Sequence, residues 1–243
     1  MKKPRDIRFA FISDTHGDRV DHEALSVALH FIKRWWKPEI RIHGGDLFDF
    51  RWIRSKANLD DQRDDPNPDI NAGYDIIDRY KPTHMLWGNH DDRLFRIARS
   101  TDMPHARHAQ MLADQITDKL DCPILPYDKR RGILRFGNVA FLHGYTFALN
   151  AMQMQANYYG TCVAGHTHRV EARRAARYEG CVGYGAGCMC LLDQDYNLGT
   201  LSTLQHGHGF VYGTVRPNGR CAVFQAFPLE GVWNIPTEMR GGR

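Results

Sequence analysis

The sequence predicts one α/β domain over residues 1–243, in which parallel strands deliver polar side chains to a common edge. Three observations lead to this prediction. Short apolar runs end at a small residue beside Asp, Asn or His, a helical stripe of apolar residues separates the first two runs, and hairpin patterns dominate the second half. The runs with their polar ends are Ile7–Gly17, Ile40–Asp49, Thr83–Asp92, Val139–Gly144 and Cys162–His168.

The composition is that of an ordinary globular protein, with 42% hydrophobic and 25% charged residues. No apolar run approaches the roughly 18–20 residues that a membrane span needs. The charged N-terminus, Met1–Asp6, lacks the apolar core of a signal peptide, so we expect a cytoplasmic protein without a membrane partner. The net charge of +4 is compatible with a polyanionic substrate but does not require one.

Six cysteines are present, and without a secretion signal we expect them to be reduced thiols. Cys188 and Cys190 are separated by one residue, which is too close for the two-residue spacing of a C-x-x-C metal knuckle. Cysteine therefore does not enter the expected set of metal ligands.

The first elements predict a βαβ unit. A strand over Ile7–Ile12 leads to a helix that Asp21 caps, that runs to Trp36, and that Pro38 ends. The next strand, Glu39–His43, should lie parallel to the first through a right-handed crossover. His43 precedes the polar loop by two residues, and we interpret it as a structural histidine.

The segment Phe50–Asp69 is charged, contains prolines and is long for a connection. Long loops in compact domains are usually functional or disordered. The segment begins one residue after Asp49, so two interpretations stay open: a lid that selects the substrate, or a solvated surface excursion.

The remaining elements follow from helical periodicity and turn residues. Gly137-Asn138 and Pro217-Asn218-Gly219 each predict a hairpin turn. We expect helices over Asp69–Tyr80, Arg93–Arg99, His105–Leu120 and Thr146–Tyr159, and hairpins that pair Gly132–Phe136 with Val139–Leu142 and Phe210–Val215 with Arg220–Phe227.

Ligands of open α/β sheets bind outside the carboxyl ends of the strands. Five strand ends loaded with carboxylate, amide and imidazole groups should therefore converge on one site. Their motifs resemble the five signature blocks of the calcineurin-like metallophosphoesterases, over about residues 7–168. The motifs are Asp14-x-His16, Gly45-Asp46-x-x-Asp49, Gly88-Asn89-His90-Asp91, His143 and Gly165-His166-x-His168.

The resemblance implies a four-layer α/β/β/α sandwich of two mixed sheets and two bound divalent transition metals. It assigns Asp14, His16, Asp46 and His168 to the first metal, and Asp46, Asn89, His143 and His166 to the second, with Asp46 bridging. Two such ions neutralise phosphoryl oxygens and lower the pKa of a bound water. The mixed oxygen and nitrogen donors suit Mn²⁺, Fe, Zn²⁺ or Ni²⁺ better than Ca²⁺ or Mg²⁺, and we favour manganese.

The resemblance also implies that His90 faces the phosphate, where it stabilises charge or protonates the leaving oxygen. Such a histidine needs an orienting carboxylate. Asp49 stands at the spacing that phosphoprotein phosphatases use, Asp91 is the competitor, and we favour Asp49.

One departure bears on the substrate. Phosphoprotein phosphatases carry Asp-Arg-Gly where this chain has Asp49-Phe50-Arg51, so the phosphate-gripping arginine is displaced. We expect Arg51 and Arg54 to supply phosphate contacts instead. The predicted function is a phosphodiesterase acting on a nucleotide or nucleic acid. One alternative is a phosphomonoesterase that acts on proteins or small metabolites. A non-catalytic scaffold is the alternative that we favour least, because the chain retains all of the expected ligands.

A stretch near the C-terminus resembles the Gln-x-Gly-Phe stretch of phage-encoded members, and it contains Tyr196 and Gln205–Phe210. Within it, His206 and His208 could recruit a metal or could be structural residues of a hairpin. The sequence leaves this choice, the exact substrate and the oligomeric state open.

Overall fold

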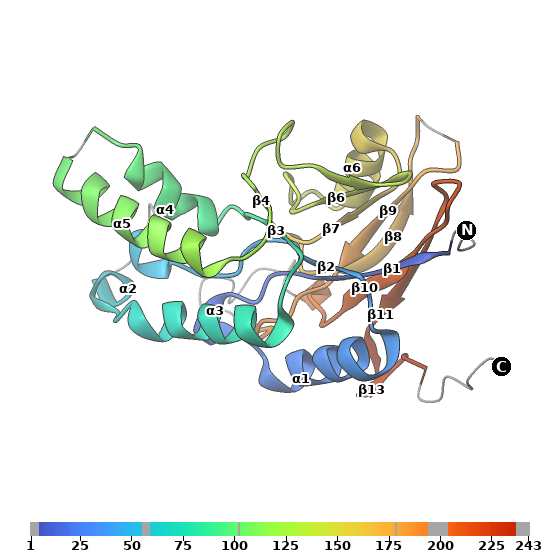
Figure 1. Ribbon diagram of the computed structural model, residues 1–243, viewed down its shortest axis with the longest axis horizontal. Helices are drawn as coiled ribbons and strands as arrows, with labels where there is room; N and C mark the ends of the chain where they lie inside the picture. The colour runs from blue at the N-terminus through green and yellow to red at the C-terminus, as the bar shows by residue number, and fades with distance from the viewer. Residues whose placement is uncertain (1–4, 55–58, 102, 178, 194–203, 237–243) are drawn as a thin grey trace.

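Two mixed β-sheets pack face to face, with helices on both outer faces (Figure 1). This arrangement confirms the predicted α/β/β/α sandwich of two mixed sheets. The computed structural model describes residues 5–54, 59–101, 103–177, 179–193 and 204–236. No helix within these ranges is long and apolar enough to cross a membrane.

The first sheet has six strands in the order β11-β10-β1-β2-β3-β4. Strands β1 to β4 are parallel, whereas β10 and β11 form an antiparallel hairpin on the side of β1. Its strands are β1 Ile7–Ile12, β2 Ile40–His43, β3 His84–Leu86, β4 Ile124–Leu125, β10 Phe210–Val215 and β11 Cys221–Ala226.

The second sheet has five strands in the order β5-β6-β7-β9-β8, with β6, β7 and β9 parallel. Its strands are β5 Leu134–Phe136, β6 Val139–Leu142, β7 Cys162–Ala164, β8 Val170–Arg174 and β9 Val182–Ala186. A small separate hairpin joins β12 Pro228–Leu229 to β13 Val232–Trp233.

The helices divide between the two outer faces (Figure 1). Helices α1, α3, α4 and α5 pack on the six-stranded sheet, and α6 packs on the five-stranded sheet. Their bounds are α1 His22–His30, α2 Leu59–Arg63, α3 Asn67–Tyr80, α4 Asp91–Ala98, α5 Met103–Lys119 and α6 Ala151–Tyr159. Short 3₁₀ turns cover η1 Gly17–Arg19 and η3 Arg51–Ile53, and a π-helix, η2 Phe31–Trp36, follows α1.

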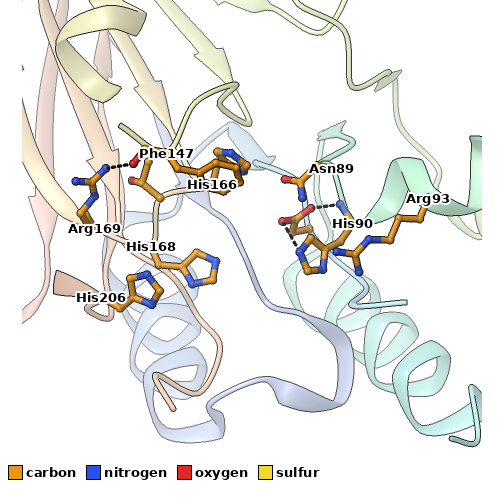
Figure 2. A pocket seen from close by; sticks show the side chains of 10 residues that line it. Asn89, His90, Arg93, Phe147, His166, His168, Arg169 and His206 are labelled. Carbon is orange, nitrogen blue, oxygen red and sulfur yellow. Dashed lines mark hydrogen bonds and ion pairs between the residues drawn. The ribbon is translucent and has the colours of Figure 1, made fainter. Parts of the chain in front are cut away.

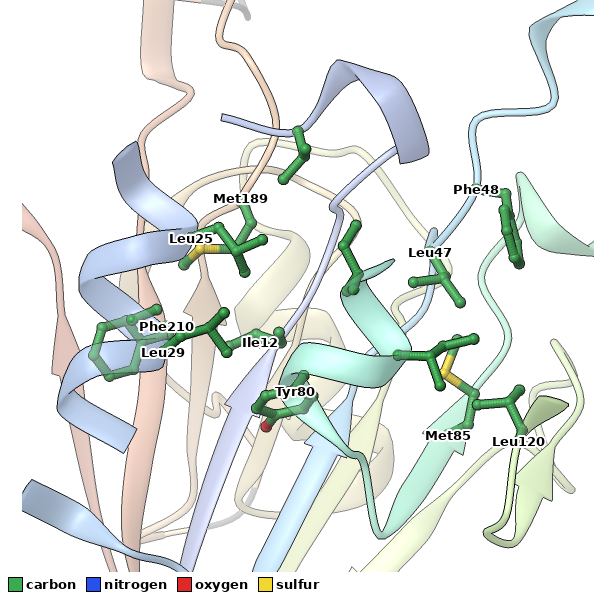
Figure 3. Packing of buried hydrophobic residues seen from close by; sticks show 14 of the residues in the cluster. Ile12, Leu25, Leu29, Leu47, Phe48, Tyr80, Met85, Leu120, Met189 and Phe210 are labelled. Atoms are coloured by element: carbon green, nitrogen blue, oxygen red, sulfur yellow. The ribbon is translucent and has the colours of Figure 1, made fainter. Parts of the chain in front are cut away.

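Strand β1 shows how the layers form, because alternate side chains point to opposite faces. Phe9 and Phe11 point between the sheets, where the Phe9 ring lies 5.0 Å from the Phe141 ring of β6. Ala10 and Ile12 point to the helical layer, and Figure 3 shows Ile12 among the helix side chains. Both faces of this central strand are thus buried, as a near-continuous apolar run requires.

Two predicted helices differ from those observed. The helix that begins at His22 widens into π-helical turns, which place the Trp36 ring parallel to that of Phe31 and let its indole N–H donate to the Phe9 carbonyl oxygen at 2.8 Å. The helix predicted from Thr146 begins only at Ala151. The predicted parallel β1–β2 pair and both hairpins are confirmed.

Candidate metal centre

The loops after five strands bring the seven predicted donor residues to one place, at the carboxyl ends of both sheets. The donors follow β1, β2, β3, β6 and β7, and they are Asp14, His16, Asp46, Asn89, His143, His166 and His168. Neither sheet could build this cluster alone, so the site depends on how the two sheets pack.

Three donors from β1 and β7 form one group. His168 Nε2 lies 3.3 Å from Asp14 Oδ1 and 3.3 Å from His16 Nε2. The backbone N–H of His166 donates to both carboxylate oxygens of Asp14, at 3.1 and 3.0 Å, which fixes the carboxylate at the crossing of the two loops.

Four donors form the second group. His143 Nε2 lies 3.3 Å from Asp46 Oδ2, 3.0 Å from Asn89 Oδ1 and 3.2 Å from His166 Nδ1. His143 Nδ1 lies 2.9 Å from the Gly44 carbonyl oxygen and so carries a proton, which leaves a lone pair on Nε2 in the neutral ring.

Asp46 lies between the two groups, since its Oδ2 is 3.8 Å from His16 Nε2 and 3.3 Å from His143 Nε2. The donor set fits cations, because facing imidazole nitrogens can share only one proton, whereas a metal ion accepts a lone pair from each. His166 Nε2 is also buried without a hydrogen-bond partner in the described part of the chain. The arrangement can therefore hold two metal ions with Asp46 between them.

Five of the seven donors adopt a left-handed backbone conformation, which residues other than glycine rarely adopt. Their φ angles are 56° for Asp14, 50° for His16, 50° for Asp46, 68° for His166 and 54° for His168. Backbone strain of this kind concentrates at functional sites. Hydrogen bonds from the Asp14 N–H to the Gly45 carbonyl oxygen and from the His16 N–H to the Asp46 carbonyl oxygen, both 3.0 Å, hold two of these loops together.

Two motif glycines allow the carboxylates their positions. A Cβ atom on Gly88 would lie 2.1 Å from Asp46 Oδ1, and one on Gly165 would lie 2.3 Å from Asp14 Oδ2. Any larger residue at either position would displace a carboxylate that faces the donor cluster.

Asp49 contacts two imidazoles at once. Its Oδ1 lies 2.7 Å from His90 Nδ1 and 3.2 Å from His16 Nδ1, so the Nε2 atom of each ring stays available toward the cluster. Burial raises the pKa of Asp49, but the hydrogen bonds from His16 and His90 outweigh it and hold that pKa well below its ordinary value. One carboxylate thus orients a histidine of the donor cluster and the expected catalytic histidine together.

Asp91, the alternative to Asp49 as the orienting partner of His90, binds backbone groups instead. Its carboxylate accepts the backbone N–H groups of Leu47, Phe48 and Gly88 at 3.3, 3.0 and 2.9 Å. Burial, followed by the charge of Asp46, raises its pKa to about 7. Asp91 therefore ties the loop after β2 to the loop after β3.

Four of the seven donors line a pocket of about 390 Å³ (Figure 2). The residues that line it are Asp46, Asn89, His90, Arg93, Phe147, His166, Thr167, His168, Arg169 and His206. The arginines at the pocket are thus Arg93 and Arg169, each close in sequence to a signature motif.

Arg51 and Arg54 do not line this pocket, contrary to their expected role as phosphate contacts. Arg51 makes ion pairs with Asp18, at 2.6 Å, and with Asp64, and Arg54 pairs with Asp61. The physical reason is local charge, because the acidic residues of the same segment and of η1 bind both guanidinium groups. The lid interpretation of residues 50–69 stays a prediction, and residues 55–58 lie outside the described ranges.

His206 and His208 make different contacts. The His206 ring lies 4.9 Å from the His168 ring at the pocket, and its Nδ1 is buried without a partner in the residues described. His208 Nε2 donates to the Cys190 carbonyl oxygen at 3.0 Å. His206 therefore belongs to the site, His208 has a structural contact, and Tyr196 lies outside the described residues.

Cys190 was not expected near the site, but its buried Sγ lies 3.8 Å from His168 Nδ1. One potential donor atom from each of Cys190, His16 and His168 lies within 4.8 Å of the other two, so the three residues form a group that could hold a metal ion. Burial raises the pKa of the Cys190 thiol well above its ordinary value, which favours the neutral S–H form. All six cysteines are free thiols, as predicted.

Asp69 was not among the predicted site residues. It follows Asp49 by twenty residues in the sequence and supports the loop that carries Asp49. Its buried carboxylate accepts the backbone N–H groups of Asp49 at 3.0 Å and Phe50 at 2.8 Å. Burial raises its pKa to about 6, from an ordinary value of 3.8.

This shift predicts a pH dependence of stability. Below about pH 4 the carboxyl is protonated in both the folded and the unfolded protein, and between pH 4 and 6 ionisation favours the unfolded chain. The free energy of unfolding should fall by roughly 3 kcal/mol across that range from this group. Asp69→Asn, which cannot ionise, should remove this part of the slope. Urea unfolding of the metal-free proteins from pH 4 to 7 measures it, and parallel profiles for the two proteins would contradict the assignment.

The sequence profile of calcineurin-like phosphoesterases matches residues 7–170, a span that contains all seven donors and His90. A metallophosphoesterase from Sphaerobacter thermophilus has a similar structure with a TM-score of 0.47 and 17% identity, covering 91% of this chain and 87% of that one. A conserved uncharacterized protein from Streptococcus pneumoniae, described as a predicted phosphoesterase, gives 0.38 and 12%, covering 91% and 98%. No curated protein matches the chain.

Proposed function

Because the chain belongs to the calcineurin-like phosphoesterase family and is thus a metal-dependent phosphoester hydrolase, we propose that it cleaves a phosphodiester in a nucleotide or nucleic acid. The pocket supports this proposal, since it extends from the donor cluster in two directions, toward Arg93 on one side and toward Phe147 and Arg169 on the other (Figure 2). A diester carries a group on each side of the phosphorus and would use both directions.

We assign the two metals to the two donor groups. Asp14, His16, Asp46 and His168 would hold one ion, and Asp46, Asn89, His143 and His166 the other. When bound, the ions would neutralise charge on the phosphoryl oxygens and lower the pKa of a water, so that the water could lose a proton and attack the phosphorus. Their mixed oxygen and nitrogen shell favours Mn²⁺, with Fe, Zn²⁺ and Ni²⁺ as alternatives.

The chain's own groups would orient and protonate the substrate. His90 presents Nε2 toward the donors, where it can stabilise charge on the leaving oxygen or give it a proton, while Asp49 holds Nδ1. Arg93 donates to the Asp49 carbonyl oxygen at 2.8 Å and lines the same side of the pocket. Its guanidinium is therefore placed to contact phosphate where Arg51 is not.

A metal-supplemented assay tests the proposal. Metal-loaded protein should hydrolyse bis(p-nitrophenyl) phosphate with a kcat/KM at least about tenfold above that for p-nitrophenyl phosphate, because the monoester leaves one side of the pocket empty. The ratio should hold with Mn²⁺, Zn²⁺ or Ni²⁺ even if the absolute rates differ. A clear preference for the monoester would instead identify a phosphomonoesterase.

A further inference from the structure

We propose, building on the phosphodiesterase function above, that Phe147 is a stacking platform for a nucleobase of the substrate and that Arg169 fixes this platform beside the metals. The substrate would then be a nucleotide diester whose base lies on Phe147 while its phosphate faces the donor cluster. Phe147 would determine specificity for a nucleoside group over a simple alkyl group.

Phe147 is conspicuous because it lines the pocket and is nevertheless 72% exposed. Its ring centroid lies 4.0 Å from that of His166, with the ring planes inclined by 36°. The ring thus leans on a metal-site residue (Figure 2) and leaves most of its surface open at the pocket. An aromatic ring this exposed adds little to the core, so its placement points to contact with a ligand.

Arg169 explains how an exposed phenylalanine is held in place. Its guanidinium is largely buried, and it donates to the Ala148 carbonyl oxygen at 2.7 Å. It also donates to the Phe147 carbonyl oxygen at 3.4 Å (Figure 2). It also donates to Gln205 Oε1 at 3.3 Å and lies 3.7 Å from Glu171 Oε1. These bonds hold the carbonyl groups of Phe147 and Ala148 in the loop just before α6, which begins at Ala151.

The contact between the Phe147 and His166 rings specifies the ligand. A group stacked on Phe147 lies next to a metal-site imidazole, so it must be covalently close to the phosphate that the metals bind. A planar base linked through a sugar to a phosphate meets this requirement. Stacking of a base on an aromatic side chain is worth about 1–3 kcal/mol and tolerates every base. A preordered ring gains more from stacking because less ordering is needed on binding.

Binding of two matched ligands tests the platform without hydrolysis. Calorimetry with metal-loaded protein would compare adenosine 5′-monophosphate with ribose 5-phosphate, which lacks only the base. Wild-type protein should bind the nucleotide about 5- to 100-fold more tightly, the range that a stacking contact supplies. Phe147→Ala should remove most of this difference, Phe147→Trp should retain it, and binding of ribose 5-phosphate should hardly change.

Leu149→Ala is the matched control, because Leu149 is equally exposed in the same loop but does not line the pocket. It should leave the ratio of the two affinities unchanged. Equal affinity for both ligands in wild-type protein, or a ratio that survives Phe147→Ala, would overturn the platform. Metal content measured on each variant verifies that the site is intact.

Hydrolysis separates this proposal from the proposed function. Diester cleavage without any effect of the base would overturn the platform and leave the phosphodiesterase intact. A Phe147-dependent preference for the nucleotide in a protein that cleaves no diester would support the platform and overturn the phosphodiesterase.

Discussion

Asp46→Asn should lower kcat/KM on the order of 10³-fold or more. Asp46 lies between the two donor groups, and its Oδ2 is 3.8 Å from His16 Nε2 and 3.3 Å from His143 Nε2. An amide is isosteric but neutral, so it can accept the His90 N–H at Oδ1, as Asp46 does at 2.8 Å, yet cannot bridge two cations as an anion does. The expected loss corresponds to the several kcal/mol that a metal supplies to the transition state.

Metal analysis gives the direct measurement. Purified wild-type protein supplied with Mn²⁺ should contain nearly two ions per chain, and the Asp46→Asn protein should lose one or both. Asp75→Asn makes the same chemical change on the exposed surface of α3, where Asp75 pairs with Arg79 at 3.0 Å, and it should leave metal content and rate unchanged. An Asp46→Asn protein with two ions and full activity would exclude the bridging role.

The convergence of these polar strand ends could be predicted because each follows an apolar strand, whereas the choice of individual donors came from the resemblance to a known family. A strand of a parallel sheet has only one edge at which its carboxyl end can lie, so Asp14, Asp46 and Asn89 had to approach one another once their strands were identified. The hairpin patterns placed His143 in the same way. The packing of the second sheet on the first, through contacts such as Phe9 with Phe141, then brings the two sets together.

The rest of the site comes from chain segments whose position no local pattern specifies. Asp69 reaches the Asp49 loop from the start of α3, and Cys190 and His206 approach His168 from the region after the fifth signature motif. Arg51 shows the opposite error, because adjacency to Asp49 suggested a place in the pocket that Asp18 prevents by binding its guanidinium. Proximity in sequence located the loops, but the ion pairs of Arg51 with acidic neighbours go with its absence from the pocket lining, which contains Arg93 and Arg169.

His90→Ala should lower the rate by about 10²- to 10⁴-fold while both metals stay bound, the range that a general acid contributes. The geometry by itself permits a rival role, since one nitrogen of His90 lies within 4.8 Å of donor atoms of His16 and Asp46 and could bind a metal. The 2.7 Å contact with Asp49 argues for the catalytic role, because it occupies Nδ1 and fixes the ring with Nε2 toward the pocket.

Leaving groups distinguish the two roles of His90. A poor leaving group, such as the sugar hydroxyl of a dinucleotide, needs a proton far more than p-nitrophenolate does, so His90→Ala should slow the dinucleotide more than bis(p-nitrophenyl) phosphate. Asp49→Asn should shift the same ratio in the same direction but less, since it weakens the orientation of His90 without removing the ring. Rates on both substrates with metal content measured in parallel test this. A His90→Ala protein that loses metal and slows both substrates by one factor would make His90 a ligand, and the proton would then have to come from another group at the pocket.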